Sequence, residues 1–185
     1  MKRFIFLLFA IVFLMSSTAY ADSIVMQFGG TGHWYQRIDK LLDWDEAQAY
    51  AAAKGGYLAT ILSAEEDDFI FNKLNDGKTY WLGGTDLNLD GIWEWENGDG
   101  QFKSDGSMGY TNFYPGEPNL SGRYLQYWRA NTGKWDDTTI SHNNWKNKFI
   151  VEYNTKTVPE PATMLLLGAG LAGLAGVGRK RITKM

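Results

Sequence analysis

Nearly forty residues without clear helical or strand periodicity separate the apolar stretch 80–84 from the alternating stretch 124–129. A connection of that length inside a compact domain is usually either functional or disordered. This one is dense in glycine, asparagine and aspartate, yet it also holds six aromatic side chains: Trp93, Trp95, Phe102, Tyr110, Phe113 and Tyr114. So many aromatic groups indicate packing rather than disorder. The fold therefore has to accommodate a long, ordered, irregular loop.

The first 21 residues have the composition of a secretory signal. Lys2 and Arg3 precede an unbroken apolar run over residues 4–15, and a small-x-small cleavage site follows at residues 19–21. The apolar run is shorter than the ~20 residues that a membrane span requires. We therefore expect residues 1–21 to be removed as a signal peptide.

The C-terminal region has three parts in a fixed order. Residues 159–161 (PEP) precede an apolar, glycine-rich run over residues 162–178, and a basic cluster follows at residues 179–181. This order and spacing resemble the PEP-CTERM sorting tag of Gram-negative bacteria. The resemblance implies that a membrane enzyme, the exosortase, processes residues 158–185, with transient anchoring through the apolar run. It predicts export to the cell envelope, cell surface or exterior. It indicates where the protein is delivered and says nothing of its activity.

The remaining domain, residues 22–157, is acidic and lacks cysteine. Twelve lysines and arginines against twenty aspartates and glutamates give it a net charge of −8. This charge argues against nucleic acid as a partner. Without disulfides, an exported domain depends on its packed core. The two histidines, His33 and His142, lie in no metal or catalytic-triad spacing, which argues against an enzyme.

Capping signals predict two helices. Asp43 with Glu46 is a capping-box pair before a helix over residues 44–53, and Ser63 with Glu66 repeats the pattern before a second helix. The acidic run 65–68 is expected to be a solvated helix face. The buried faces should hold Trp44, Ala47 and Ala51 in the first helix and Ile70, Phe71 and Leu74 in the second. Strands are predicted over residues 33–38, 57–61, 80–84, 124–129, 133–137 and 148–153.

Several of these stretches are similar to the landmarks of C-type lectin-like domains. Residues 43–70 are similar to the two-helix opening of that family, and residues 80–86 (YWLGGTD) resemble its core strand motif. EPN at residues 117–119 followed by KWDD at residues 134–137 is similar to the motif pair that builds its calcium and sugar site. The resemblance covers residues 32–154. It implies an α+β fold of two helices and a small antiparallel sheet with a long irregular loop region.

The family resemblance also implies two disulfide positions, which this chain fills with apolar residues. One pair falls at Ala51 and Val151, and the other at Leu125 and Ile140. Losing a bridge costs about 2–4 kcal/mol of stability, and burying the replacements recovers part of it. We expect each bridge to be exchanged for a packed contact.

The same resemblance places a calcium site between Glu117, Asn119, Asp136 and Asp137. Proline restricts its own φ and the conformation of the residue before it, and an X-Pro bond can be cis at low cost. The side chains of Glu117 and Asn119, which flank Pro118, are therefore expected to form a rigid oxygen-bearing pair. Oxygen ligands suit a hard cation such as Ca²⁺. In the family, adjacent sugar hydroxyls replace waters on the ion.

The resemblance further implies the ligand. Glu117, Asn119 and Asp136 would contact the sugar, and the Glu-Pro-Asn motif is associated with mannose- or glucose-like diols. Tyr114, Tyr124 and Trp145 are candidates to stack on the sugar, with core packing as the alternative for each. The predicted function is an exported, calcium-dependent carbohydrate-binding module without enzymatic activity, whose ligand is expected to be an extracellular polysaccharide.

Arg123 supports an alternative. It falls where the family usually has a further glutamate ligand, and a guanidinium near the ion would repel it. In the alternative, Arg123 pairs with Glu117, no metal binds, and the domain binds protein or mediates adhesion.

A second, auxiliary calcium site of the family would include Asp86 and Asp90. Its other two positions hold Leu120 and Tyr124, which offer no carboxylate. We therefore expect Asp86 and Asp90 to cap turns instead.

Overall fold

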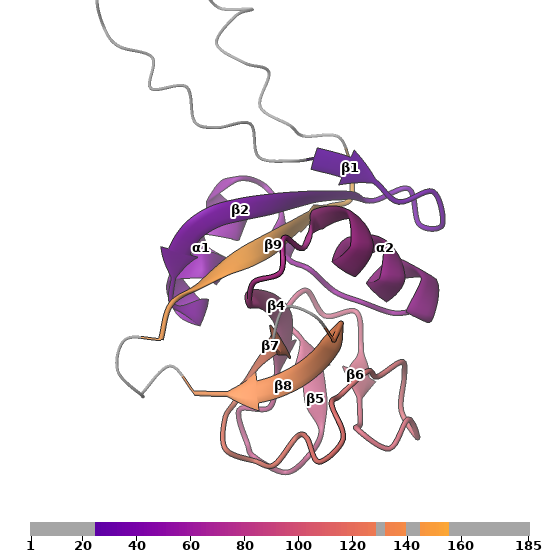
Figure 1. The fold of residues 1–185 in the computed structure, drawn as a ribbon, viewed down its shortest axis with the longest axis vertical. Coiled ribbons are helices and arrows are strands. Elements are labelled where there is room, and N and C mark those ends of the chain that lie inside the picture. Colours follow the sequence, from indigo (N-terminus) through magenta and orange to yellow (C-terminus); the bar gives the residue numbers. More distant parts are fainter. Residues whose placement is uncertain (1–24, 129–131, 140–144, 156–185) are drawn as a thin grey trace, which may run out of the picture. The chain divides into compact units, whose positions relative to one another are not determined.

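A computed structural model describes residues 25–128, 132–139 and 145–155. These ranges contain two helices, α1 (Trp44–Ala53) and α2 (Ala64–Leu74), and nine strands (Figure 1). The strands are β1 (Val25–Gln27), β2 (Trp34–Leu42), β3 (Tyr57–Leu58), β4 (Tyr80–Thr85), β5 (Trp93–Trp95), β6 (Gln101–Phe102), β7 (Tyr124–Trp128), β8 (Lys134–Thr138) and β9 (Asn147–Tyr153). Each predicted strand is present; the stretch 57–61 is shorter than predicted, and the stretch 33–38 continues to residue 42.

The described strands form one sheet, which is mixed rather than antiparallel. Its main order is β1-β2-β9-β4-β5-β6, while β7 pairs with β4 and β8, and β3 pairs with β9. The exception to antiparallel pairing is β4 with β9, where Tyr80 lies opposite Lys148 and Trp81 opposite Phe149. A parallel pair requires a long crossover instead of a hairpin. Here the long loop and the β7–β8 hairpin supply that connection, so the purely antiparallel prediction was wrong on this point.

Helix α1 begins and ends where its sequence signals indicate. The Asp43 carboxylate accepts a hydrogen bond from the Glu46 N–H at 2.8 Å, and the Glu46 carboxylate accepts one from the Asp43 N–H at 3.2 Å. The helix buries Trp44, Ala47 and Ala51, as predicted. The capping box is therefore complete, and it fixes where the chain leaves β2.

Only half of the second capping box forms. The Ser63 hydroxyl accepts from the Glu66 N–H at 3.2 Å. The Glu66 carboxylate instead accepts from the Leu62 N–H at 2.7 Å and from the Tyr35 hydroxyl. Of the predicted buried face, Ile70 and Leu74 are fully buried and Phe71 packs partly buried against the core.

The acidic run 65–68 is not one solvated face, which corrects that prediction. Glu66 and Asp67 are each only 2% exposed, whereas Glu65 and Asp68 lie on the surface. Successive helical residues turn by about 100°, so four consecutive residues occupy both faces. The two inward carboxylates are tolerated because tyrosine hydroxyls and other donors satisfy them.

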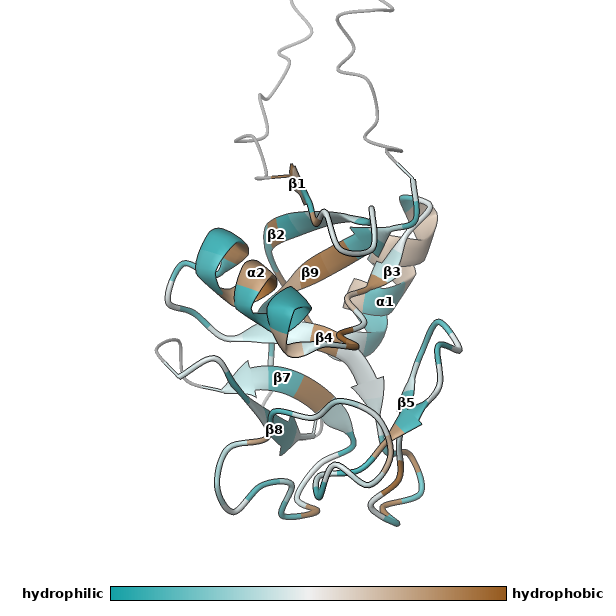
Figure 2. Ribbon diagram, turned by 90° about the vertical axis from the view of Figure 1, so that its right-hand side faces the viewer, coloured by the Kyte–Doolittle hydropathy of each residue, from teal (hydrophilic) through white to brown (hydrophobic). Residues whose placement is uncertain are grey.

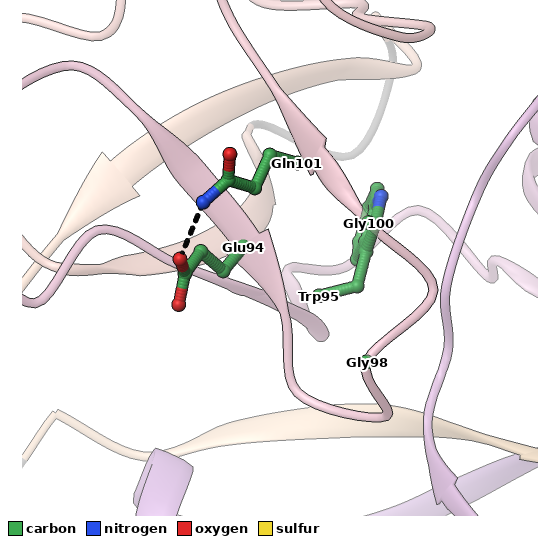
Figure 3. A pocket seen from close by; sticks show the side chains of 5 residues that line it. All are labelled: Glu94, Trp95, Gly98, Gly100 and Gln101. Atoms are coloured by element: carbon green, nitrogen blue, oxygen red, sulfur yellow. Dashed lines mark hydrogen bonds between the residues drawn. The ribbon is translucent and has the colours of Figure 1, made fainter.

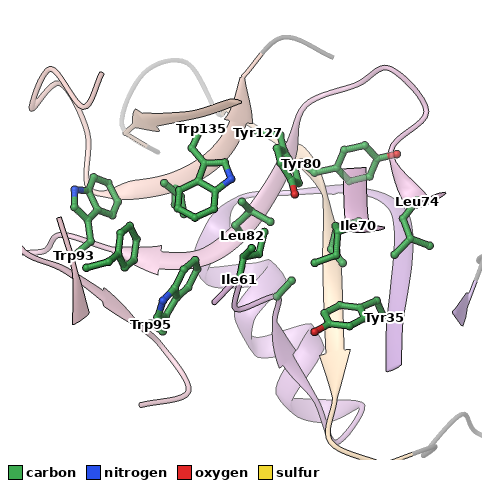
Figure 4. Packing of buried hydrophobic residues seen from close by; sticks show 14 residues of the cluster. Tyr35, Ile61, Ile70, Leu74, Tyr80, Leu82, Trp93, Trp95, Tyr127 and Trp135 are labelled. Carbon is green, nitrogen blue, oxygen red and sulfur yellow. The ribbon is translucent and has the colours of Figure 1, made fainter. Parts of the chain in front are cut away.

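Five of the six aromatic side chains of the long loop pack in or against the core, as predicted, and Tyr114 is exposed. Figure 4 shows Trp93, Trp95 and Trp135 gathered at one end of the larger hydrophobic cluster, with Tyr35 and Leu74 toward the other. The Trp95 and Phe102 rings stack with centroids 4.6 Å apart. The loop is less irregular than expected, since the short strands β5 and β6 pair within it.

A second cluster lies between α1 and β9, and it contains the first expected disulfide replacement. Ala51 and Val151 are both fully buried there. Figure 2 shows hydrophobic residues along β9 and hydrophilic residues over much of α2. Leu125 is buried in the larger cluster, while its expected partner Ile140 lies outside the described residues.

The predicted signal peptide, residues 1–21, and the apolar run 162–178 also lie outside the described residues. Within the described ranges, neither helix combines the length and the apolar character needed to span a membrane.

Candidate functional site

Three carboxylates from two separate stretches of chain meet at one point. Glu117 lies in the loop before β7, and Asp136 and Asp137 lie on β8. One carboxylate oxygen from each residue lies within 4.8 Å of the others. The structure therefore brings together three of the four residues that the sequence nominated as metal ligands.

Backbone pairing positions Glu117 beside β8. Phe113 forms a parallel bridge with Trp135, and the Tyr114 N–H donates to the Trp135 carbonyl at 2.9 Å. The Glu117 N–H then donates to the Tyr114 carbonyl at 2.8 Å. The Glu117–Pro118 peptide bond is cis. The long loop is thus fastened to the strand that carries the two aspartates.

Asn119, the fourth nominated residue, contacts the same carboxylates through its backbone. Its N–H lies 2.8 Å from Asp137 Oδ1 and 3.0 Å from Glu117 Oε2. Its side-chain oxygen accepts from the Ser121 N–H at 2.8 Å, which closes a turn. A carbonyl oxygen has a second lone pair, so Asn119 Oδ1 can still accept another interaction.

Burial and neighbouring negative charge disfavour the ionised forms of Glu117 and Asp136. Burial raises the pKa of Glu117, and the nearby Asp136 and Asp137 raise it further. Burial also raises the pKa of Asp136, with Asp137 adding to the effect, although the Gln126 amide opposes it by hydrogen bonding. A divalent cation between such groups would favour their charged forms. The donor set of carboxylate and amide oxygens fits calcium.

Two family models match the chain. The model of the lectin C-type domain matches residues 40–153, and that of the PEP-CTERM protein-sorting motif matches residues 157–181. This chain belongs to the C-type lectin domain family. The predicted C-type lectin-like fold is thereby confirmed, with its sheet mixed.

Relatives of this C-type lectin domain include proteins with and without calcium dependence. Perlucin of Haliotis laevigata is 37% identical over 93 residues, which are 49% of this chain and 54% of perlucin. A calcium-independent type II antifreeze protein is 26% identical, with a TM-score of 0.55 over 71% of this chain and 96% of its own. The calcium-free form of a Ca²⁺-dependent type II antifreeze protein is also 26% identical, with a TM-score of 0.58 over 69% and 95%.

The chain spans about half the length of perlucin and about a quarter or less of three other curated relatives, which include halomucin of Haloquadratum walsbyi. Because similar proteins differ in their dependence on calcium, calcium binding by this chain has to be argued from its own residues.

Arg123 stays outside the carboxylate group of this lectin domain. Its side chain is exposed, its N–H donates to the Thr138 carbonyl at 3.0 Å, and its carbonyl accepts from the Asp86 N–H at 3.0 Å. Within the described ranges, no salt bridge joins Arg123 to Glu117. The ion pair expected in the alternative interpretation is not formed.

Asp86 and Asp90 cap turns, as predicted. Asp86 accepts from the N–H groups of Asp90 at 3.2 Å and Gly91 at 2.9 Å. Asp90 accepts from the Ile92 N–H at 3.0 Å. Leu120, at a ligand position of the auxiliary site in the family, is exposed.

The candidate stacking residues keep accessible surface. Tyr114 is 36% exposed and Trp145 is 45% exposed. Tyr114 also packs edge-on against Trp128, with ring centroids 4.6 Å apart. Tyr124 packs against Trp44 at 4.9 Å, which favours a packing role for it.

Two features of the domain were not anticipated from the sequence. A shallow pocket lies along the β5–β6 hairpin, where Glu94 accepts a hydrogen bond from Gln101 at 2.6 Å (Figure 3). Gln126 is buried beside Asp136. Its signal in the sequence is a single amide within the otherwise apolar and aromatic stretch YLQYW.

Proposed function

We propose that this protein is an exported, calcium-dependent carbohydrate-binding module of mannose or glucose type, acting at the cell surface or in the extracellular matrix of a Gram-negative bacterium. The observation that carries the proposal is the convergence of Glu117, Asp136 and Asp137 within 4.8 Å. The family match over residues 40–153 and the sorting-motif match over residues 157–181 support the binding class and the export route.

Each nominated residue has a role in the proposal. Glu117, Asn119, Asp136 and Asp137 hold Ca²⁺, and the bound ion supplies positive charge that attracts two adjacent sugar hydroxyls. Glu117 and Asp136 accept hydrogen bonds from those hydroxyls, while the Asn119 amide donates or accepts. The exposed faces of Tyr114 and Trp145 pack against the sugar ring.

The proposal assigns each segment a task. Residues 1–21 direct export, and residues 22–157 form the binding domain with its core at residues 32–154. Residues 158–185 are processed by the exosortase after transient anchoring through residues 162–178. A polysaccharide is the proposed partner, in line with the sugar-binding role of the site. The net charge of the domain, −8, disfavours nucleic acid as a partner. Neither matched family is one of enzymes, so the proposal contains no catalytic step.

The experiment is a calcium titration of the full chain, followed by tryptophan fluorescence and thermal melting. Millimolar calcium should raise the melting temperature, and the protein should be retained on a mannose column until a chelator is added. Glu117→Gln and Asp137→Asn should abolish both effects, while the turn-capping control Asp90→Asn should leave them unchanged. Absence of any calcium-dependent shift in the wild-type protein would overturn the proposal.

A second candidate function is a metal-independent protein-binding domain of the same fold. The exposed guanidinium of Arg123, on the loop that also holds Asn119, favours it. A similar antifreeze protein of this fold is calcium-independent, which supports this alternative. Chelator-insensitive binding to a protein ligand, lost in Arg123→Ala, would identify this function.

A further inference from the structure

Gln126 is a buried polar residue on β7. It is 2% exposed, and its chain neighbours Leu125 and Tyr127 face the larger hydrophobic cluster. Because side chains alternate along a strand, Gln126 points to the opposite face. Burying an amide is costly unless both of its ends have hydrogen-bond partners. The partners of Gln126 therefore define why an amide lies there.

Those partners connect Gln126 to the candidate calcium site. It lies directly opposite Asp136 in the β7–β8 register. Its Nε2 donates to Asp136 Oδ2 at 2.9 Å, and its Oε1 accepts from Asn147 Nδ2 at 2.8 Å. An ionised carboxylate only accepts hydrogen bonds, so Gln126 has to present its NH₂ group to Asp136 and its oxygen to Asn147. The carboxylate of Asp136 thus sets the direction of the Gln126 amide. Asn147 donates to Gln126 in the orientation opposite to the one that the Lys146 carbonyl and the Trp145 indole N–H favour.

We infer that Gln126 is a positioning residue for Asp136: it holds Oδ2 and directs the lone pairs of Oδ1 to the point shared with Glu117 and Asp137. This inference rests on the proposed calcium-binding function. The carboxylate torsion of aspartate is broad and roughly two-fold, so it does not fix its own orientation. A hydrogen bond from a neighbouring side chain to a ligand supplies that constraint.

If Gln126 positions Asp136 in this way, Asp136→Asn should weaken calcium binding. Asparagine oxygen is an acceptable calcium ligand. Opposite Gln126, however, the asparagine introduced at position 136 has to turn its oxygen to Gln126 Nε2. Its NH₂ group then points to the ion position, and an NH₂ group does not ligate a cation. Asp136→Asn therefore loses a ligand because of Gln126.

Adding Gln126→Glu should reverse this loss. The carboxylate introduced at position 126 accepts from the NH₂ group introduced at position 136, which returns the oxygen of that amide to the ion position. Asn147 can still donate to the carboxylate. The double variant exchanges an amide and a carboxylate across one hydrogen bond, and it keeps the total charge.

The test compares calcium affinity of the full chain by calorimetry in the wild type, Gln126→Met, Asp136→Asn and the double variant Gln126→Glu with Asp136→Asn. Gln126→Met should weaken calcium binding by about 10–100-fold, the usual effect of losing a residue that orients a ligand. Asp136→Asn should weaken it at least as much, because a ligand itself is lost. The double variant should recover most of the loss relative to Asp136→Asn.

One further readout and one control variant separate positioning from a general structural role. Luminescence lifetimes of bound Tb³⁺ in H₂O and D₂O report the number of waters on the ion, which should increase in Gln126→Met and return toward the wild-type value in the double variant. Tyr127→Phe is the matched control: it removes a buried hydrogen bond from the adjacent residue on the other face of β7, so it should lower the melting temperature and leave calcium affinity unchanged.

The outcomes distinguish the inference from the function on which it rests. A wild-type protein that binds no calcium overturns both. A wild-type protein that binds calcium, with Asp136→Asn binding equally well or with no recovery in the double variant, overturns the positioning role alone.

Discussion

The hydroxyl group of Tyr127 donates a hydrogen bond to the carboxylate of Asp67, although 60 residues separate them in the sequence. Tyr110 and Asn112 donate to the other oxygen of this carboxylate, at 2.9 Å and 2.6 Å. Burial raises the pKa of Asp67, while these hydrogen bonds oppose the rise. One buried acid on α2 is therefore bonded to β7 and to the part of the long loop that precedes Glu117.

Removing this acid should destabilise the domain strongly. Asp67→Ala leaves three donors without their acceptor, and each buried unsatisfied donor costs about 1–3 kcal/mol. We expect the free energy of unfolding to fall by at least about 2 kcal/mol in urea denaturation, since relaxation and water entry satisfy some of the donors. The adjacent, exposed Asp68 is the matched control, and Asp68→Ala should change stability by less than about 0.5 kcal/mol. Equal effects of the two substitutions would contradict the structural role of Asp67.

Glu152 should make the stability of the domain depend on pH. It is buried on β9, where it accepts from His33 Nδ1 at 2.6 Å, the Tyr57 hydroxyl at 3.0 Å and the Thr60 N–H at 2.8 Å. Burial raises its pKa above the ordinary value of 4.5, and the hydrogen bonds only partly offset this. The unfolded chain therefore releases the proton at lower pH than the folded domain does.

The stabilisation of the folded state by the protonated Glu152 carboxyl group is consequently present below pH 4.5. It is lost as the pH rises through the raised pKa of Glu152. Glu152→Gln has no such titration. The difference in unfolding free energy between this variant and the wild type should shift in favour of the variant as the pH increases from 4 to 7. Urea denaturation at several pH values, with calcium removed, measures the difference. A pH-independent difference would contradict the raised pKa.

The parts of the fold that the sequence predicted are those with local causes. Helix α1 begins after Asp43 because the capping box needs only residues within one turn. The turns at Asp86 and Asp90 likewise depend on backbone donors a few residues away. Trp95 and Phe102 could be assigned to the core because large aromatic groups rarely stay exposed in such numbers.

The parts that were missed depend on partners distant in sequence. Strands β5 and β6 are too short, at three and two residues, for alternation to be recognised. Glu66 is buried because Tyr35, 31 residues earlier, supplies a hydroxyl. The pairing of Gln126 with Asp136 follows from the β7–β8 register, which a pattern of residue types does not specify.

The candidate site was only partly accessible to sequence reasoning. The nomination of Glu117, Asp136 and Asp137 came from a family resemblance, and the structure brings their oxygens together. The position of the Arg123 side chain could not be inferred, because the loop around it is irregular and its direction is set by backbone bonds to Thr138 and Asp86.

Calcium binding should stabilise the folded domain by an amount set by its affinity. A ligand that binds only the folded state, at 100 times its dissociation constant, adds about 2.7 kcal/mol to the unfolding free energy. Urea denaturation at increasing calcium concentrations should follow this logarithmic dependence in the wild type. In Asp137→Asn the dependence should disappear, and magnesium, which demands a tighter octahedral geometry, should substitute poorly for calcium.

The buried residues at the positions of the first family disulfide, Ala51 and Val151, should accept a bridge. Ala51 on α1 and Val151 on β9 share one cluster, and Gly56 lies close to both: its N–H donates to the Ala51 carbonyl at 3.1 Å, and a Cβ at this glycine would lie 2.8 Å from a Val151 methyl group. Ala51→Cys combined with Val151→Cys should form a disulfide on oxidation and raise stability by about 2–4 kcal/mol over the reduced form. Thiol titration and denaturation measure both; two free thiols after oxidation would show that the two side chains do not meet.

The close approach of Gly122 to β8 provides a test of how the loop is held over the site. A Cβ at this position would lie 1.9 Å from the carbonyl carbon of Thr138, so any side chain displaces the backbone. Its N–H also donates to Asp137 Oδ2 at 2.7 Å. Gly122→Ala should therefore cost about 1–3 kcal/mol of stability, the usual range for overpacking, and should weaken calcium binding as well because Asp137 loses a donor that orients it. Gly29, where an added Cβ meets nothing within 4 Å, is the control, and Gly29→Ala should change neither quantity. If Gly122→Ala lowered the melting temperature but calorimetry gave an unchanged calcium affinity, the loop would support the fold without orienting Asp137.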